Sequence, residues 1–158
     1  MAGLTDISLG NFTDIIYAPT GTAIPPADLS VGDVFAAIGD VQTVGDISDE
    51  ATIVDVQAYG QKYLKKLVGS ANAAAIEVVC NYDPSDASQT DLLTAYSDST
   101  KRNVAIVMLE NDTGNNGTYN AFEVLVASSS VSNSFDETRT ITFSLVPTNG
   151  IGIYQSLT

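Results

Sequence analysis

The chain has 158 residues and a mass of 16.5 kDa, a length typical of one domain that folds without a metal or a disulfide. It has 6 basic and 19 acidic residues, a net charge of −13, one cysteine and no histidine. These counts exclude Ser-His-Asp and Cys-His catalysis, the usual Cys/His zinc sites, an internal disulfide and nucleic-acid binding through a large basic patch.

Residues 1–33 are rich in Gly, Pro, Thr and Asp, a composition typical of loops. The short apolar run Ile15–Ala18 predicts a single strand within them. No apolar run approaches the ~20 residues of a transmembrane helix, and the first ten residues lack the basic start and apolar core of a signal peptide. We therefore expect an acidic, intracellular, soluble domain with an N-terminal strand and loop arm.

Short β-branched runs separated by turn residues follow from Val34 onward, a pattern typical of an all-β domain. Alternating apolar residues predict strands at 34–38, 54–58 and 76–81, with a bulge at Gly39–Asp40 after the first. Between the first and last of these strands, residues 45–72 are interpreted as a long loop region. Its acidic and basic residues lie at opposite ends: Asp46, Asp49 and Glu50, then Lys62, Lys65 and Lys66.

The pattern changes to a helical period at about residues 84–97. Asp83 is the predicted N-cap and Pro84 suits the first helical position. Gln89, Leu92, Leu93 and Tyr96 share one side at spacings of three and four, and this stripe is expected to pack on a sheet.

Four more segments read as strands. Val104–Leu109 is apolar on both faces, so we expect it to be buried on both sides. Phe122, Val124 and Val126 form one face of the next strand, and the serine-rich stretch 128–134 is interpreted as a strand or bent strand. Apolar residues at 141, 143 and 145 alternate with a polar face made of Thr138, Thr140, Thr142 and Ser144.

The sequence 112–123 matches a calcium-binding loop at positions 1, 5, 6 and 12. Position 3 is Gly114, which has no side-chain ligand, and both flanks read as strands. Asn116-Gly117 between apolar runs favours a β-hairpin instead. Cys80 alternates with core positions and is expected to be a buried, inert thiol. With so many carboxylates, no pair indicates an enzyme, and we expect no catalytic site, cofactor or metal.

The junction after the 76–81 strand is the most informative motif. It contains Asn81, Tyr82, Asp83, Pro84, Asp86, Gln89 and Leu92. This segment resembles the N-Y-D-P-x-D-x-x-Q-x-x-L segment of major tail tube proteins of long-tailed (siphovirus-type) bacteriophages. The order of strands around it also resembles theirs along nearly the whole chain.

The resemblance implies one tail tube domain over residues 1–158, mainly β, in which two antiparallel sheets pack as a sandwich or barrel with one flanking helix. It implies hexameric rings of identical copies, stacked into the hollow tail tube of a virion through which DNA is ejected without sequence-specific binding. It further implies assembly in the host cytoplasm, other tail proteins such as the tape measure, tail tip and tail terminator as partners, and no membrane. Two alternatives stay open: a tube protein of a contractile injection or secretion system, and a monomeric β-sandwich binding module.

The uneven charge of the 45–72 region suggests where copies meet. Opposite charges on two surfaces steer association and fix its register. We therefore expect inter-ring contacts in which Asp46, Asp49 and Glu50 of one subunit face Lys62, Lys65 and Lys66 of a neighbour. The alternative to these contacts is that the three lysines lie in a turn that is simply exposed to solvent.

Overall fold

A computed structural model describes residues 13–18, 36–109, 117–148 and 154–157 of the chain. Within these ranges the fold has ten strands and one helix. The strands are β1 (Thr13–Ala18), β2 (Ala36–Ala37), β3 (Val41–Val44), β4 (Asp49–Val56), β5 (Lys65–Ala73), β6 (Ile76–Asn81), β7 (Lys101–Leu109), β8 (Gly117–Ser132), β9 (Thr140–Pro147) and β10 (Tyr154–Leu157), and the helix is α1 (Ala87–Asp98).

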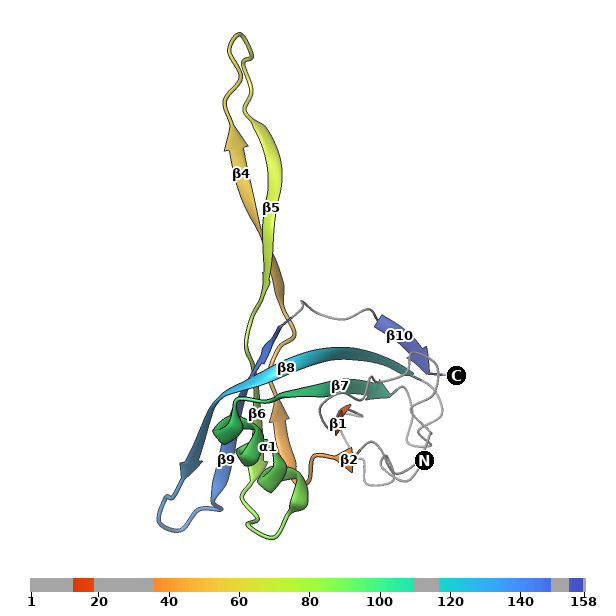
Figure 1. Cartoon of the computed structure of the whole chain (residues 1–158), viewed down its shortest axis with the longest axis vertical. Coiled ribbons are helices and arrows are strands. Elements are labelled where there is room, and N and C mark those ends of the chain that lie inside the picture. Colours follow the sequence, from red (N-terminus) through yellow and green to blue (C-terminus); the bar gives the residue numbers. More distant parts are fainter. Residues whose placement is uncertain (1–12, 19–35, 110–116, 149–153, 158) are drawn as a thin grey trace.

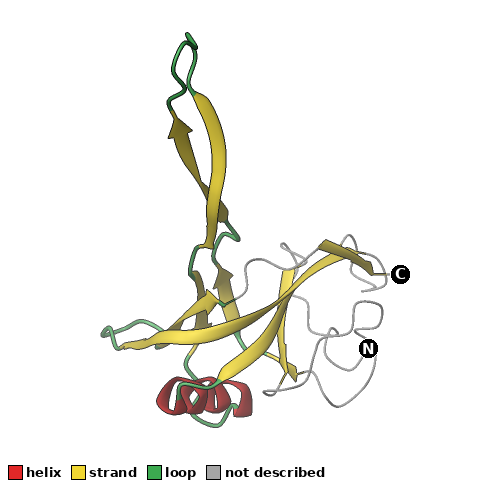
Figure 2. Ribbon diagram, turned by 45° about the horizontal axis from the view of Figure 1, so that its top comes forward, coloured by secondary structure: helices red, strands yellow, loops and turns green. Residues whose placement is uncertain are grey.

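Eight strands form one antiparallel sheet in the order β2-β1-β7-β8-β9-β6-β3, with β10 beside the start of β8. Strand β8 joins the two halves of this sheet. Its first part pairs with β7 from Gly117 to Leu125, and its second part pairs with β9 from Val124 to Ser132. A bulge between Val126 and Ser128 interrupts the second pairing where the strand bends across the body (Figures 1 and 2).

The core lies between the two halves of the folded sheet. One half contributes side chains such as Ile15, Ile106 and Phe122, the other half Val78 and Phe143, and all of them are buried. Helix α1 lies against one end of this core (Figure 2). The predicted fold, a mainly β structure of packed antiparallel layers with one flanking helix, is confirmed, although its two layers belong to a single continuous sheet.

Several predicted strands have the expected burial. Residues 104–107 of β7 are buried on both faces, and β6 and β9 alternate between buried and less buried positions. The serine-rich stretch is the distal part of β8, which ends at Ser132. The antiparallel pairing of Leu109 with Gly117 confirms a hairpin between β7 and β8. Most of the calcium-like loop, 110–116, lies outside the described residues, as do most of 1–33 and Val34.

The predicted strand at 34–38 is confirmed only in part. Of its described residues, 36 and 37 belong to β2 and Ile38 does not, and Gly39–Asp40 is a turn into β3 rather than a bulge. Asp40 adopts a left-handed backbone conformation there, with φ of 55°. The backbone N–H of Ile38 donates to the carbonyl of Ile15, which keeps this turn next to β1.

The helix begins three residues later than predicted. Asp86, not Asp83, is the N-cap, and its Oδ1 accepts from the backbone N–H of Ser88 at 2.7 Å. Its buried side is also shifted, since Tyr96 is exposed and Leu93 is only partly buried. The buried residues are Ser88, Gln89, Leu92 and Ala95.

The largest difference from the sequence prediction concerns residues 45–72. The sequence interpretation makes them a long loop region around one strand at 54–58, whereas most of them form the antiparallel hairpin of β4 and β5, which projects far from the body (Figure 1). We call residues 49–73 the arm. The arm shares no backbone pairing with the eight-stranded sheet.

Candidate assembly surfaces

The arm is a two-stranded ribbon with solvent around it. Val56 pairs with Lys65, and the register continues in pairs to Ile53 opposite Val68. β-branched residues favour the extended backbone of these strands, and a turn containing Gly60, with φ of 83°, reverses the chain at the tip. Every residue of the arm except Ala73 at its base and Ala58 near its tip is exposed.

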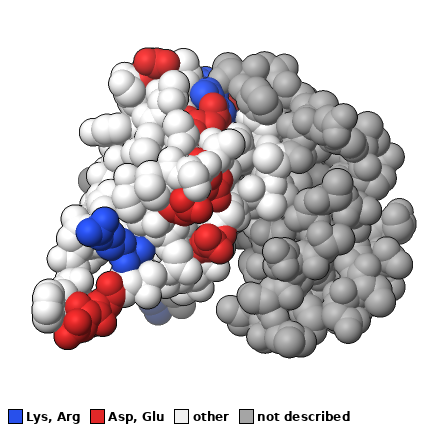
Figure 3. All heavy atoms as spheres, turned by 90° about the horizontal axis from the view of Figure 1, so that it is seen from below, with Lys and Arg blue, Asp and Glu red and all other residues white. Residues whose placement is uncertain are grey.

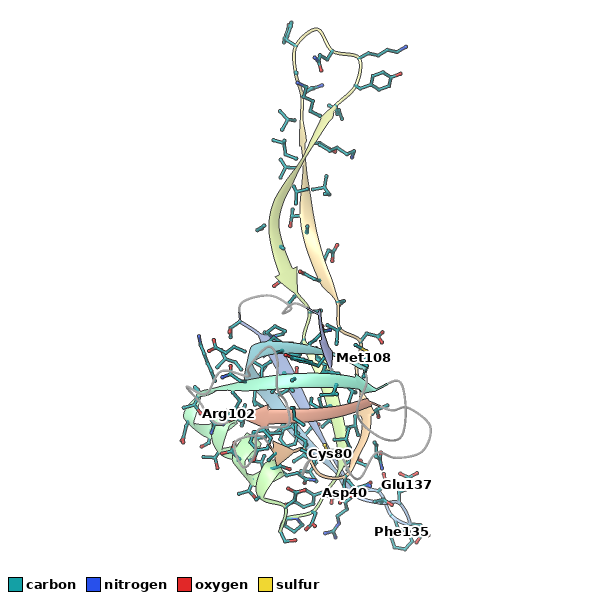
Figure 4. The ribbon with its side chains drawn as sticks, turned by 90° about the vertical axis from the view of Figure 1, so that its right-hand side faces the viewer. Asp40, Cys80, Arg102, Met108, Phe135 and Glu137 are labelled. Carbon is teal, nitrogen blue, oxygen red and sulfur yellow. The ribbon has the colours of Figure 1, made fainter. Side chains whose placement is uncertain are left out.

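The arm is unusually apolar for so exposed an element. Ile53, Val54, Leu67 and Val68 are 52%, 47%, 57% and 72% exposed. Tyr59, Tyr63 and Leu64, in the turn between β4 and β5, are exposed as well, and Figure 4 shows side chains along the whole length of the arm. Clustered exposed apolar side chains mark interaction sites, and an isolated two-stranded hairpin is marginally stable in water. The arm therefore has the properties of a segment completed by another molecule.

The charged residues predicted for inter-subunit contacts lie at the two ends of the arm. Asp49 and Glu50 begin β4 at the base, with Asp46 just before them, whereas the three lysines lie at the tip and the start of β5. Within one subunit the two groups are therefore not brought together. One lysine of this set forms an ion pair, between Lys66 Nζ and Asp55 Oδ1 at 3.0 Å, inside the arm itself.

The family-like motif forms the junction between β6 and α1. Gln89 is almost fully buried, and its Nε2 donates to the Asn81 carbonyl at 2.7 Å while its Oε1 accepts from the Asp83 N–H at 3.1 Å. Leu92 is buried in the core. A Cβ at Gly39 would overlap the Asp86 carboxylate, so the turn after β2 fits closely against the helix cap. These contacts give the motif residues a structural role in fastening the helix to the sheet.

A second surface lies on the sheet face opposite the core. Ser128, Ser130 and Ser132 of β8 pair with Ser144, Thr142 and Thr140 of β9. These hydroxyl side chains share the face that alternates with buried Ile141 and Phe143. Glu77 of β6, paired with Ser144, is the charged residue among the β6 and β9 positions on this face. We call this surface the hydroxyl face.

The end of the body opposite the arm carries more acidic than basic side chains (Figure 3). Asp40 and Glu137 lie at this end together with Phe135, which is highly exposed in the turn between β8 and β9 (Figure 4). Half of the basic residues of the chain thus lie on the arm, whereas this end of the body is mainly acidic.

The described part of the chain contains no cluster of three or more Asp, Glu, Cys or His residues that could hold a metal. Cys80 is buried, and burial raises the pKa of its thiol to about 12, with Asp86 and Asp40 adding to the shift. It is therefore protonated and unreactive at neutral pH, as expected. Among the described helices, none is long and apolar enough to cross a membrane.

No protein-family model and no curated protein matches the chain. Solved structures do. A chain of the SPP1 tail tube matches with a TM-score of 0.62 and 14% identity, covering 94% of this chain and 78% of that one. A chain of the six-fold symmetrised anti-feeding prophage (AFP) baseplate matches with a TM-score of 0.69 and 11% identity, covering 96% and 95%. A chain from the tail of an empty gene transfer agent particle, with C6 symmetry, matches with a TM-score of 0.59 and 14% identity, covering 89% and 94%.

The chain has the tail tube fold. The matches extend over nearly its whole length, so the resemblance implied by the junction motif holds for the fold as a whole. At 11–14% identity, these matches establish a shared backbone fold but do not relate individual surface residues of the proteins.

Sequence reasoning missed the arm's apolar character. Two adjacent apolar pairs, Ile53-Val54 and Leu67-Val68, were visible in the sequence. Adjacent residues of a strand point to opposite faces, so each pair places one apolar side chain on each face. Adjacent apolar residues in both strands of a two-stranded hairpin are therefore the sequence signal for an arm with two apolar faces.

Proposed function

We propose that this protein is the structural subunit of a bacteriophage tail tube, in which six copies form a ring and rings stack into a hollow tube that conducts DNA. The fold shared with chains of the SPP1 tail tube and the gene transfer agent tail supports this role. The six-fold symmetry named for the gene transfer agent tail and the AFP baseplate supports the hexameric ring. The role is structural, without catalytic turnover, and the site of action is the virion.

The main observation behind this proposal is that a body with the tail tube fold carries an apolar and exposed two-stranded hairpin. Such a hairpin is only marginally stable in water by itself. A monomeric binding module would expose this surface to water permanently. A subunit of a closed ring and a stacked tube buries it against identical copies.

The hydroxyl face suits the wall of a DNA channel. Duplex DNA carries one negative charge per ~1.7 Å, so a wall with basic side chains would retain it. Serine and threonine hydroxyls with Glu77 among them offer no cation to the phosphates. We assign this face to the lumen, and we propose a tape measure, a tail tip and a tail terminator as the other partners of the tube.

We further propose that the arm makes contacts between rings, with Lys62, Lys65 and Lys66 facing acids of a neighbouring subunit, among them Asp46, Asp49 and Glu50. Opposite charges at the two ends of the arm support this pairing. Reversal of Lys65 and Lys66 to Glu is expected to prevent tube assembly while leaving the far-ultraviolet circular dichroism of the subunit unchanged. Tubes of normal length from this variant would contradict the pairing.

Negative-stain electron microscopy of the concentrated protein and of particles from the parent lysate tests the function directly. We expect rings with six subunits and tubes with a central channel. A protein that stays monomeric at all concentrations and is absent from particles would overturn the proposal. Because an AFP baseplate chain matches as well, the second candidate is a tube of a contractile injection machine, and a sheath around the tube in the parent particle would favour it.

A further inference from the structure

One polar side chain of the body is buried without a hydrogen-bond partner. Asn120 is 0% exposed, and among the described residues neither its Nδ2 nor its Oδ1 has a partner. Gln89, the other buried amide of the described residues, donates from Nε2 to the Asn81 carbonyl and accepts at Oε1 from the Asp83 N–H. Burying an amide without hydrogen bonds is unfavourable, and nearly all such groups in folded proteins have a partner. Asn120 therefore needs a partner that the described chain does not supply.

The Asn120 side chain lies on the core face of β8. Phe122 and Val124 follow it at intervals of two residues and belong to the core, and residues two apart in a strand share a face. Across the sheet Asn120 pairs with Ile106 of β7 on one side and with Tyr154 of β10 on the other. Ile106 is itself a buried core residue. The amide is thus a polar group on an otherwise apolar face.

The core meets solvent close to this position. Two residues before Asn120 in β8, Thr118 pairs with Met108 of β7. Met108 is partly exposed, whereas Ile106, its neighbour on the same face of β7, is buried. The row that contains Ile106 and Asn120 therefore lies at the edge of the core, and water has only a short path to the amide.

We propose that the Asn120 side chain is a buried hydration site, which holds at least one water molecule inside the body. A buried water forms about three hydrogen bonds, typically to polar groups that are otherwise unpaired, and an amide offers two donors and one acceptor. Water is the fitting ligand because Ile106 and Phe122 are apolar and the described residues include no cluster that could hold a metal. The site lies within one subunit and does not depend on the proposed tube function.

A structure that resolves ordered water tests the proposal directly, either from crystals of the subunit or from a helical reconstruction of tubes. We expect a water within about 3.2 Å of Nδ2 or Oδ1 of Asn120. An amide that contacts only apolar atoms, or one that bonds only to protein atoms, would overturn the proposal. If the wild-type protein forms no tubes, the proposed function fails, whereas crystals of the subunit still test the hydration site.

Two matched variants provide a second test. Leucine is larger than asparagine, so Asn120→Leu fits only if a displaced water leaves room, and in a dry, close-packed site the added volume would be destabilising. Gln89→Leu is the control, because it leaves the Asn81 carbonyl and the Asp83 N–H without their partner. We expect Asn120→Leu to melt at or above the temperature of the wild type, and Gln89→Leu to melt lower by about 4 °C or more.

The two melting temperatures decide between a hydrated and a dry amide. A loss for Asn120→Leu as large as that for Gln89→Leu would show that the Asn120 amide bonds to protein atoms or lies in a site without room for water, and the proposal would be wrong. A tolerated Asn120→Leu whose structure lacks the water seen beside Asn120 in the wild type would support it.

Discussion

Arg102 joins the helix to the sheet at the level of single residues. Its buried guanidinium donates to both carboxylate oxygens of Asp91, at 2.9 and 3.2 Å, and to Thr100 Oγ1 at 2.8 Å. A two-point contact of this kind fixes both distance and orientation. It keeps α1 aligned with β7, next to the core residues that the helix buries.

Asp91→Ala is expected to destabilise the subunit by about 2 kcal/mol, since it leaves a buried guanidinium without its carboxylate partner. Asp98→Ala is the matched control on the same helix. Asp98 is exposed at the negative, C-terminal end of the helix dipole, so its removal is expected to be neutral or slightly stabilising. Urea unfolding of the two variants measures the difference, and equal stability losses would contradict this role for Asp91.

Glu123 gives stability a dependence on pH. Its Oε1 accepts from Lys101 Nζ at 2.9 Å and from Thr148 Oγ1 at 2.8 Å. Hydrogen bonds from the side chains of Lys101 and Thr148, with the charge of Lys101, hold the pKa of Glu123 below its ordinary value. Since the folded pKa is depressed, this contribution to stability is present above the unfolded pKa of about 4.3 and is lost as pH falls through the folded pKa.

The difference in unfolding free energy between wild type and Glu123→Gln is therefore expected to be largest near neutral pH and to shrink below about pH 4. Thr148→Val removes one of the two donors and should show an intermediate pH dependence. Urea titrations between pH 3 and 7 measure these differences. A difference that is constant over this range would mean that the ionised carboxylate is not the stabilising species.

At the level of secondary-structure elements, the helix was only partly predictable from the sequence. The spacing of its apolar residues predicted that a helix is present and which residues form much of its buried side, but not the residue at which it begins. Asp83 and Asp86 are both good N-cap residues, and the choice depends on a local turn. Asp83 Oδ1 accepts from the N–H and the hydroxyl of Ser85, which uses this carboxylate before the helix begins.

Asp86→Ala is expected to cost about 1 kcal/mol because it leaves a helix N–H unsatisfied. Asp83→Ala is expected to cost only a few tenths, since it removes a turn contact in an exposed loop. Thermal unfolding of the two variants ranks them. A larger loss for Asp83→Ala would show that the first turn of the helix depends on the junction loop rather than on its cap.

In the arm, by contrast, the sequence pattern did not predict which residues are exposed. Alternation in the core strands predicts burial correctly because the partner strands belong to the same chain, as with Ile141 and Phe143 in β9. In the arm the same kinds of residue are exposed, since none of the described elements of the subunit covers them. Hydropathy shows that a residue is apolar but not whether its own subunit covers it, so the adjacent apolar pairs Ile53-Val54 and Leu67-Val68 indicate two apolar faces without indicating that both are exposed.

At the scale of the whole molecule, the described residues form a body and an arm whose apolar residues, apart from Ala73 at its base, lie outside the buried core. The two parts are joined at the arm base, where Asp49 pairs directly with Ala73. Because Asp49 and Ala73 are neighbours across the ribbon, residues 50–72 can be replaced by a short turn containing Asn-Gly.

This armless variant is expected to fold as a monomer with a melting temperature within about 5 °C of the wild type, because the buried core is untouched. It is also expected to form no tubes, since both apolar faces and the three arm lysines are gone. Sedimentation velocity, calorimetry and electron microscopy of the same sample separate the two effects. An unfolded variant would show that the arm stabilises the body, and tubes from the variant would show that contacts between bodies suffice for stacking. A folded monomer that adds to the ends of wild-type tubes only as a chain terminator would localise the stacking function to the arm, because such a subunit could bind a neighbour's arm but offer none of its own.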